Sequence, residues 1–229
     1  MKKISDDTRI VKVYDSTLRD GAQGEGISFS LEDKLLIAEK LDDIGIQYIE
    51  GGFPNPTNPK DLEFFRHIKS LKLTNSQIVA FGSTRRASNK PEHDPGLRAL
   101  LDADTEIITI FGKSWGLHVR DVLRISLNEN LRLIEDSVRF LVSEGRRVFF
   151  DAEHFFNGYE TDAHYALNTL KAAQDGGAEI CILCDTNGGM IPDDIRVACK
   201  KVSQSIQIPF GIHCHNDSGL SSANTLTAV

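Results

Sequence analysis

The sequence Tyr14-Asp15-Ser16-Thr17-Leu18-Arg19-Asp20-Gly21-Ala22-Gln23 follows the β-branched run Ile10-Val11-Lys12-Val13 and precedes a long amphipathic segment. This order predicts a strand whose carboxyl end opens into a loop carrying one cation and two carboxylates. A turn alone does not need such a set of charges. The stretch therefore indicates that Arg19 and Asp20 face residues from other parts of the chain.

Strand and helix patterns alternate along the whole chain. Seven short apolar runs predict strands at 10–14, 46–51, 77–82, 105–111, 146–152, 179–185 and 208–214. Seven segments with helical periodicity follow them, at 30–44, 58–71, 94–102, 127–144, 162–176, 192–205 and from 219 onward. This alternation predicts a mainly parallel sheet, which is either doubly wound or closed into a (β/α)8 barrel.

Polar residues stand at the carboxyl end of nearly every predicted strand. They are Arg19-Asp20, Glu50, Ser83-Thr84-Arg85, Lys113, Glu153-His154, Asp185-Thr186-Asn187 and His213-Cys214-His215. A barrel gathers all its strand ends into one mouth, whereas an open sheet uses only those near its switch point. We therefore expect an α/β fold of the TIM (β/α)8 type, with residues 1–229 forming one catalytic domain. Since only seven βα units are found, the eighth is expected to be missing.

The composition excludes several classes of protein. A net charge of -7 argues against a nucleic-acid or anionic-membrane partner. No apolar run reaches the ~18 residues that a membrane span needs. The lysines at the N-terminus are not followed by the apolar segment of a signal peptide, and the four cysteines suit a reduced, cytoplasmic protein.

His213 and His215 flank Cys214 on the last predicted strand. Successive side chains on a strand face opposite sides, so the two imidazoles point the same way, about 7 Å apart. One carboxylate and two imidazoles with open positions are a common catalytic metal arrangement. With Asp20 at the end of the first strand, the pair predicts a divalent-metal site. Two hydrogen-bonded structural histidines are the alternative.

Two motifs in combination resemble a known superfamily. Asp15-Ser16-Thr17-Leu18-Arg19-Asp20-Gly21-x-Gln23 and His213-x-His215-Asn216-Asp217-x-Gly219-Leu220 resemble the DRE-TIM metallolyases. Within that superfamily the sequence is most similar to the 2-isopropylmalate, homocitrate and citramalate synthases. Segments 21–30, 50–54 and 58–61 resemble the citramalate synthase branch in particular. The resemblance covers essentially the whole chain and implies a TIM barrel.

The resemblance also implies roles for individual residues. The ligands of a divalent ion (Mg, Mn or Zn) would be Asp20, His213 and His215. The catalytic residues would be Arg19, Glu153 and His118, and the substrate-binding residues would be Arg19, Gln23 and Thr186. Family members usually add an asparagine contact from the eighth strand, which would lie past Val229.

The implied activity is an acetyl-CoA-dependent acyl transfer, a Claisen condensation onto an α-keto acid in branched-chain amino-acid biosynthesis. Pyruvate would give citramalate, towards isoleucine, and 2-oxoisovalerate would give 2-isopropylmalate, towards leucine. A base removes a methyl proton, the enolate attacks the keto carbon, and Arg19 stabilises charge that develops on oxygen. Glu153 and His118 are both candidates for the proton transfer. The full-length protein is expected to be a homodimer.

Two other functions stay open at this stage. One is a carbon–carbon lyase or aldolase of the HMG-CoA lyase type, against which Glu153 favours a synthase. The other is a non-catalytic barrel fragment. A wholly structural role is also possible for Arg19, as an ion-pair partner of Asp15 or Glu50.

Some residues are expected to have structural roles only. Asp15 is predicted to be a hydrogen-bond acceptor, and His154 to be a surface or structural residue. Cys181 and Cys184 stand three apart on a strand and therefore face opposite sides. They are predicted to be buried small hydrophobes that share neither a metal nor a disulfide. Phe53 and Phe81 are candidates for the apolar wall of a substrate pocket.

Overall fold

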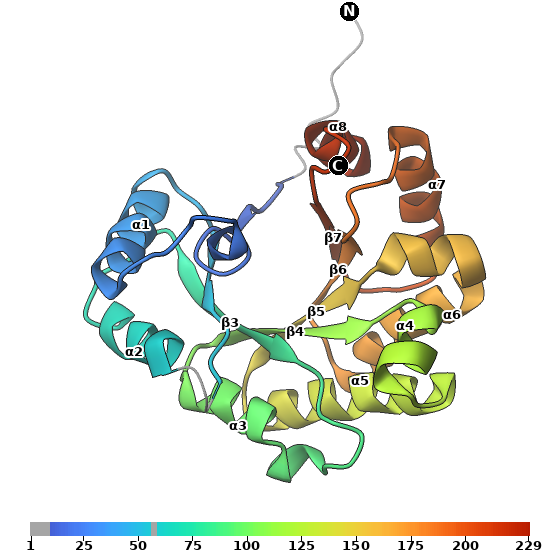
Figure 1. Ribbon diagram of the computed structural model, residues 1–229, viewed down its shortest axis with the longest axis horizontal. Coiled ribbons are helices and arrows are strands. Elements are labelled where there is room, and N and C mark those ends of the chain that lie inside the picture. Colours follow the sequence, from blue (N-terminus) through green and yellow to red (C-terminus); the bar gives the residue numbers. More distant parts are fainter. Residues whose placement is uncertain (1–9, 56–58) are drawn as a thin grey trace, which may run out of the picture.

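Seven parallel strands form one sheet in the order in which they occur along the chain. The computed structural model describes residues 10–55 and 59–229. The strands are β1 (Tyr14–Asp15), β2 (Tyr48–Gly52), β3 (Gln77–Ser83), β4 (Ile107–Lys113), β5 (Arg147–Glu153), β6 (Ile180–Asp185) and β7 (Phe210–Cys214). The sheet curls into an open barrel of which β1 and β7 are the two edges (Figure 1). The expected TIM-type architecture with seven strands is confirmed.

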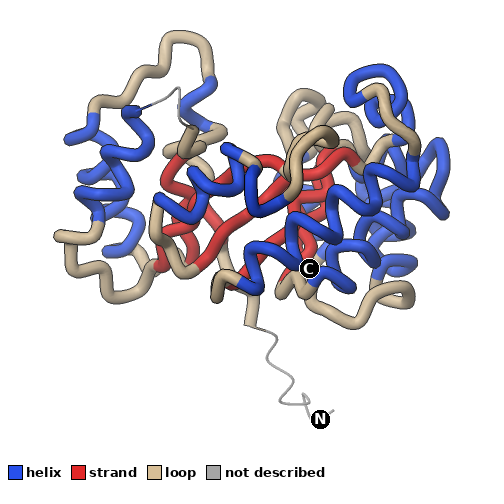
Figure 2. Tube along the Cα trace, turned by 90° about the horizontal axis from the view of Figure 1, so that it is seen from below, coloured by secondary structure: helices blue, strands red, loops and turns tan. Residues whose placement is uncertain are grey.

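Helices connect the strands and cover the outer face of the curled sheet (Figures 1 and 2). They are α1 (Leu31–Asp43), α2 (Pro59–Ile68), α3 (Pro95–Asp102), α4 (Gly116–His118), α5 (Leu127–Ser143), α6 (Phe155–Gly176), α7 (Pro192–Val202) and α8 (Ser221–Ala228). Short helical turns are η1 (Gly21–Gln23), η2 (Pro91–His93) and the π-helical η3 (Val119–Leu123). Among these described helices, none combines the length and apolar character that crossing a membrane would require.

One predicted strand began too early, and two helical segments were not predicted. The run 10–14 forms a strand only from Tyr14, and the preceding Ile10 is 87% exposed. α6 consists of two helices joined across a kink at Asp162, so the helix predicted from 162 is present, whereas the helical stretch that precedes it from Phe155 was not predicted. The predicted start is a real local signal, because Asp162 is non-helical and its carboxylate accepts from the backbone N–H of Tyr165 at 3.0 Å. The helical turns 116–123 lie in a segment for which the sequence predicted no element.

The first helix, α1, begins at a reciprocal cap between Ser30 and Asp33. The Ser30 hydroxyl accepts from the Asp33 backbone N–H at 3.1 Å, and the Asp33 carboxylate accepts from the Ser30 backbone N–H at 2.9 Å. This reciprocal pair satisfies two of the donors that every helix start leaves unpaired. Gly45 follows the helix at φ 84°, a conformation that costs glycine little. The capping residues therefore fix where the helix begins, and the glycine fixes where it ends.

Strand alternation divides the core into two clusters. The larger outer cluster lies between the sheet and its helices, and its strand members include Ile49, Ala80, Ile108, Phe150 and Cys181. The inner cluster fills the barrel, and its members are Tyr48, Val79, Ile107, Phe149, Ile182 and Cys184. Cys181 and Cys184 thus lie in different clusters, and the prediction that they face opposite sides of one strand is confirmed. Since the strands are packed on both faces, the polar residues at their ends have a rigid support.

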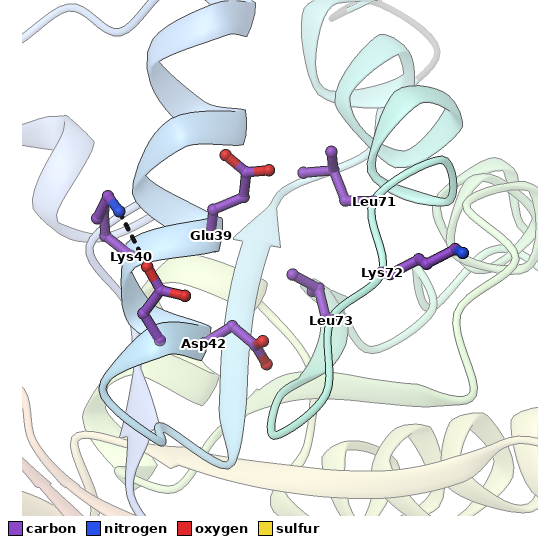
Figure 3. A pocket seen from close by; sticks show the side chains of 7 residues that line it. Glu39, Lys40, Asp42, Leu71, Lys72 and Leu73 are labelled. Atoms are coloured by element: carbon purple, nitrogen blue, oxygen red, sulfur yellow. Dashed lines mark hydrogen bonds and ion pairs between the residues drawn. The ribbon is translucent and has the colours of Figure 1, made fainter.

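A buried carboxylate ties α1 to the start of β3, at the end of the barrel away from the predicted mouth. Asp42 is 6% exposed and accepts from the backbone N–H groups of Thr74, Asn75 and Ser76 at 2.7–3.1 Å. Burial alone would raise the pKa of Asp42, but these donors hold it at about 2. A cavity of about 270 Å³ lies beside it (Figure 3). Asp42 therefore has a structural role: it stabilises the fold.

Candidate active site

Three predicted metal ligands from the two edges of the sheet converge at the mouth. Asp20 lies in the loop after β1, His213 lies in β7, and His215 directly follows β7. Both histidine Nε2 atoms lie 3.4 Å from the same atom, Oδ2 of Asp20. The two imidazole rings stack with centroids 5.0 Å apart. Curling of the sheet therefore joins residues that lie near opposite ends of the sequence.

Asp20 and His213 each stabilise the charged form of the other. The contact with His213 holds the pKa of Asp20 at about 2, against burial and with help from Arg19. Burial disfavours the charged form of His213, but Asp20 and Asp151 outweigh it and raise the pKa of His213. A carboxylate that stays ionised beside two imidazoles is a donor set that divalent cations accept.

Arg19 is fixed beside Asp20 by a second carboxylate. Its Nε and Nη2 donate to the two oxygens of Glu50 at 2.5 and 3.3 Å, and its Nη1 donates to Asp20 at 3.0 Å. Its guanidinium lies 3.8 Å from the ring centroid of Phe81. The sequence left Asp15 and Glu50 open as ion-pair partners of Arg19, and in the structure the partner is Glu50. Asp15 instead accepts from the Thr17 backbone N–H at 2.9 Å, which agrees with its predicted role.

Two further carboxyl groups lie inside the barrel beneath the mouth. Burial raises the pKa of Glu50 to about 7, although Arg19 acts in the opposite direction. Burial likewise raises the pKa of Asp151 to about 6, against the pull of His213 and Arg19. Oδ1 of Asp151 has no hydrogen-bond partner among the described residues. The floor of the mouth is therefore rich in buried acidic groups.

An aromatic group flanks Arg19 on one side. The rings of Phe53, Phe81 and Phe111 pack with centroids 5.6–6.4 Å apart. Phe81 is the ring on which Arg19 lies. The two predicted wall residues, Phe53 and Phe81, are thus neighbours next to a fixed cation. An apolar wall beside a cation can accommodate a small anion with an apolar tail.

The other predicted site residues gather at the ends of β4, β5 and β6. Glu153 forms an ion pair with Lys113. The His118 ring meets the edge of His154, with centroids 4.5 Å apart, and Trp115 packs against both rings. Burial, with Lys113 and His154 nearby, lowers the pKa of His118. Gln23 is exposed on η1, so its predicted substrate contact stays a prediction.

His154 belongs to this group, and its backbone conformation is strained. It has φ 55° and ψ 35°, a left-handed conformation that costs a non-glycine residue about 1–2 kcal/mol. Its backbone N–H donates to the Thr186 hydroxyl at 2.9 Å. Its ring packs edge-on against His118, a contact that a structural histidine also makes, so its predicted role stays a prediction. Such strain concentrates at functional positions.

The sequence model of the HMGL-like family matches residues 10–229. The chain belongs to the HMGL-like family. The HMGL-like chain is 54% identical over 220 residues to an (R)-citramalate synthase from Geobacter sulfurreducens, which covers 96% of the chain and 42% of that protein. It is 50% identical over 222 residues to an (R)-citramalate synthase from Sulfolobus acidocaldarius, which covers 97% of the chain and 42% of that protein. The predicted resemblance is confirmed.

Solved structures show the same fold. An HMG-CoA lyase from Bacillus subtilis superposes with a TM-score of 0.79, covering 95% of the HMGL-like chain and 72% of the lyase. The two sequences are only 21% identical, so this likeness concerns the fold alone. The chain spans about two fifths of the length of the curated relatives that it matches.

A divalent ion fits the residues that this HMGL-like chain presents. Asp20, His213 and His215 offer one carboxylate oxygen and two imidazole nitrogens within 4.8 Å of one another. These donors suit several divalent ions, and three protein ligands leave positions open for a substrate. The donor set thus agrees with the metal site that the sequence predicted.

Two residues of the site escaped sequence reasoning. Asp151 precedes Glu153 by two positions on β5, so strand alternation could have placed both on the inner face. Cys184 is buried, as predicted, and its Sγ also lies within 4.8 Å of ligand atoms of Asp151 and His213. That neighbourhood depends on the register of β6 against β7, which no local pattern reveals.

Proposed function

We propose that the chain is the catalytic barrel of an acyltransferase that condenses acetyl-CoA with pyruvate to give citramalate. The observation that carries this proposal is the convergence of both histidine Nε2 atoms on Oδ2 of Asp20, directly beside Arg19. Relatives with 50–54% identity named (R)-citramalate synthase support the reaction and the keto acid. The homodimer and the cytoplasmic location stay predictions.

The ligand set would bind a divalent ion, which supplies Lewis-acid polarisation of the keto carbonyl. Asp20 gives the set its negative charge, and the imidazoles of His213 and His215 complete it. Arg19 donates to Asp20 through Nη1 at 3.0 Å and so orients the carboxylate that would hold the ion. Partners of this kind fix how a ligand points.

Arg19 would stabilise the charge that grows on oxygen during condensation. Its guanidinium is held on three sides, by Glu50, Asp20 and the face of Phe81. Because these contacts are made before substrate arrives, little reorganisation is needed when the charge develops. A permanent planar cation suits this task better than a flexible ammonium.

Proton removal from the acetyl methyl group would be the task of the group at β4 and β5. Its lowered pKa keeps His118 neutral near pH 7, and its buried Nδ1 has no hydrogen-bond partner among the described residues. A neutral ring nitrogen of this kind can hold a proton. Glu153 forms an ion pair with Lys113 at the ends of β5 and β4. Either residue suits the role, directly or through water.

The aromatic group supports a small keto acid. Phe53, Phe81 and Phe111 stand beside Arg19, where the carbon tail of a keto acid would lie. Each extra methylene in such a pocket changes discrimination by only about 1–3 kcal/mol. The preference for pyruvate over its main competitor, 2-oxoisovalerate, is therefore proposed from the relatives named (R)-citramalate synthase rather than from this wall.

The test measures CoA thiol release from acetyl-CoA with a panel of keto acids, using the full-length protein. We expect release with pyruvate, its abolition in Asp20→Asn and its retention in the surface control Asp193→Asn. No release with any keto acid would overturn the proposed reaction. Faster release with 2-oxoisovalerate would overturn the choice of pyruvate, and cleavage of 3-hydroxy-3-methylglutaryl-CoA instead of condensation would indicate a lyase.

A further inference from the structure

A second group of possible ligands lies deeper in the barrel than Asp20. It consists of Asp151 on β5, Cys184 on β6 and His213 on β7, whose ligand atoms all lie within 4.8 Å of one another. Cys184 and His213 are direct neighbours in the β6–β7 ladder. We call Asp151, Cys184 and His213 the inner set, and Asp20, His213 and His215 the outer set.

The inner set is buried and only partly satisfied. Asp151 and Cys184 are each 6% exposed, and Oδ1 of Asp151 has no hydrogen-bond partner among the described residues. A buried carboxyl oxygen without a partner costs free energy that a cation would recover. The unpartnered oxygen belongs to the same group as the buried thiol and imidazole. These observations together point to a ligand.

We propose that Asp151, Cys184 and His213 form an inner cation site that takes a soft divalent ion, such as Zn²⁺ or Cd²⁺, in competition with the outer set. A thiolate is a soft ligand that Zn²⁺ and Cd²⁺ accept and that Mg²⁺ does not. The outer set has no sulfur ligand and suits harder ions as well. The two sets therefore differ in the ions that they select.

Charge balance favours the ion-bound form of the inner site. A divalent cation with one carboxylate and one thiolate is electrically neutral, and a neutral assembly is far easier to bury than an isolated charge. Binding replaces the S–H bond of Cys184 by a sulfur–metal bond, and the thiol proton leaves to solvent. Any proton on Asp151 leaves in the same way. No oxidant or reductant is involved.

His213 makes the two sites mutually exclusive. A neutral imidazole has one nitrogen with a free lone pair, so it can serve one ion at a time. An ion in the inner set withdraws His213 from Asp20 and His215. Where the proposed condensation holds, excess Zn²⁺ or Cd²⁺ will inhibit it, and Cys184→Ser will relieve the inhibition. This kinetic consequence rests on the proposed function, whereas ion binding itself does not.

The deciding experiment is ultraviolet absorbance of the protein during titration with Cd²⁺, which reports sulfur–cadmium bonds. We expect the thiolate-to-cadmium band in the wild type and its loss in Cys184→Ser. Cys181→Ser is a matched control on the opposite face of β6, and Cys214→Ser is a matched control between the two histidines. Both controls should keep the band. Asp20→Asn, which breaks only the outer set, should keep it too.

Three results would overturn the proposal. A band that survives in Cys184→Ser shows that another thiol binds the ion. A band lost in Asp20→Asn shows that Cys184 joins the outer ion rather than a separate inner site. An unchanged band in Asp151→Asn shows that the carboxylate is not a ligand of the ion. The same variant tests the inner site if Cys184→Ser fails to fold. None of these readings depends on turnover, so they stand even if no keto acid is condensed.

Discussion

Oδ2 of Asp20 lies 3.4 Å from Nε2 of His213, although one residue follows the first strand and the other belongs to the seventh. His215 approaches the same oxygen from just beyond β7. If this oxygen belongs to a metal ligand, Asp20→Asn should weaken Mn²⁺ binding by more than the ~10–100-fold typical of residues that only orient ligands. Calorimetric titration of Mn²⁺ measures this loss.

Asp15→Asn is the matched control for Asp20→Asn. Asp15 belongs to the same β1–α1 segment, but its carboxylate accepts from the backbone N–H and hydroxyl of Thr17. Its replacement should leave Mn²⁺ affinity within about twofold of the wild type, as expected for a change outside the ligand set. Equal weakening by both variants would contradict a specific role for Asp20.

Arg19→Lys should impair condensation although it preserves charge. Lysine cannot reproduce the fork that contacts both oxygens of Glu50 while also reaching Asp20. We expect kcat to fall about 10²–10³-fold, the loss typical of a group that stabilises charge in the transition state. Steady-state kinetics with pyruvate measure it. Arg139→Lys, on the surface of α5, should retain full activity, and an equally active Arg19→Lys would rule out this role.

His154→Gly should separate strain from function. Glycine tolerates φ 55° without the cost that histidine bears, so stability should change by no more than about 1 kcal/mol despite the lost ring contact with His118. Condensation should nevertheless fall about 10–100-fold, because His118 loses a partner that positions it. Thermal unfolding and kinetics give the two readings.

Arg124→Gly is the control for that substitution. Arg124 is exposed and also left-handed, at φ 56°. Relief of strain without loss of a ring contact should raise stability by about 1 kcal/mol and leave condensation unchanged. If His154→Gly proves as active as Arg124→Gly, the strained backbone of His154 has no function in turnover.

Asp42→Ala should destabilise the fold. Three backbone N–H groups lose their shared acceptor, which should lower the free energy of unfolding by about 3 kcal/mol. Asp43→Ala, which removes only an exposed pair with Lys40, should change it by less than ~0.5 kcal/mol. Urea unfolding distinguishes the two variants, and equal effects would contradict the role of the buried carboxylate.

The same residue predicts an acid dependence. The pKa of Asp42 is lowered to about 2 in the folded protein, below its ordinary value, so the folded state favours the ionised form. Its contribution is complete above about pH 4 and is lost as the pH falls towards 2. The wild type should therefore lose more stability than Asp42→Ala between pH 4 and pH 2. Parallel pH profiles would contradict this.

Local patterns predicted most elements but failed where packing decides. The β-branched run 10–14 becomes a strand only at Tyr14, where β2 provides a partner. The helical stretch from Phe155 to the kink at Asp162 was not predicted, since no side-chain cap marks its start and it is held by burial of Phe155 and Phe156 in the core. Both errors arise because propensity and capping act locally, whereas pairing and burial depend on distant neighbours.

The sequence by itself determined the alternation of strands and helices and the polar residues at strand ends, because side-chain periodicity is a property of the local backbone. It also identified Asp20, His213 and His215 as a possible ligand set. Only the tertiary structure decided that Arg19 pairs with Glu50, that His154 meets His118, and that Cys184 faces Asp151 beside His213. These contacts depend on how the sheet curls and how its strands are registered, and both are fixed by packing of the whole chain.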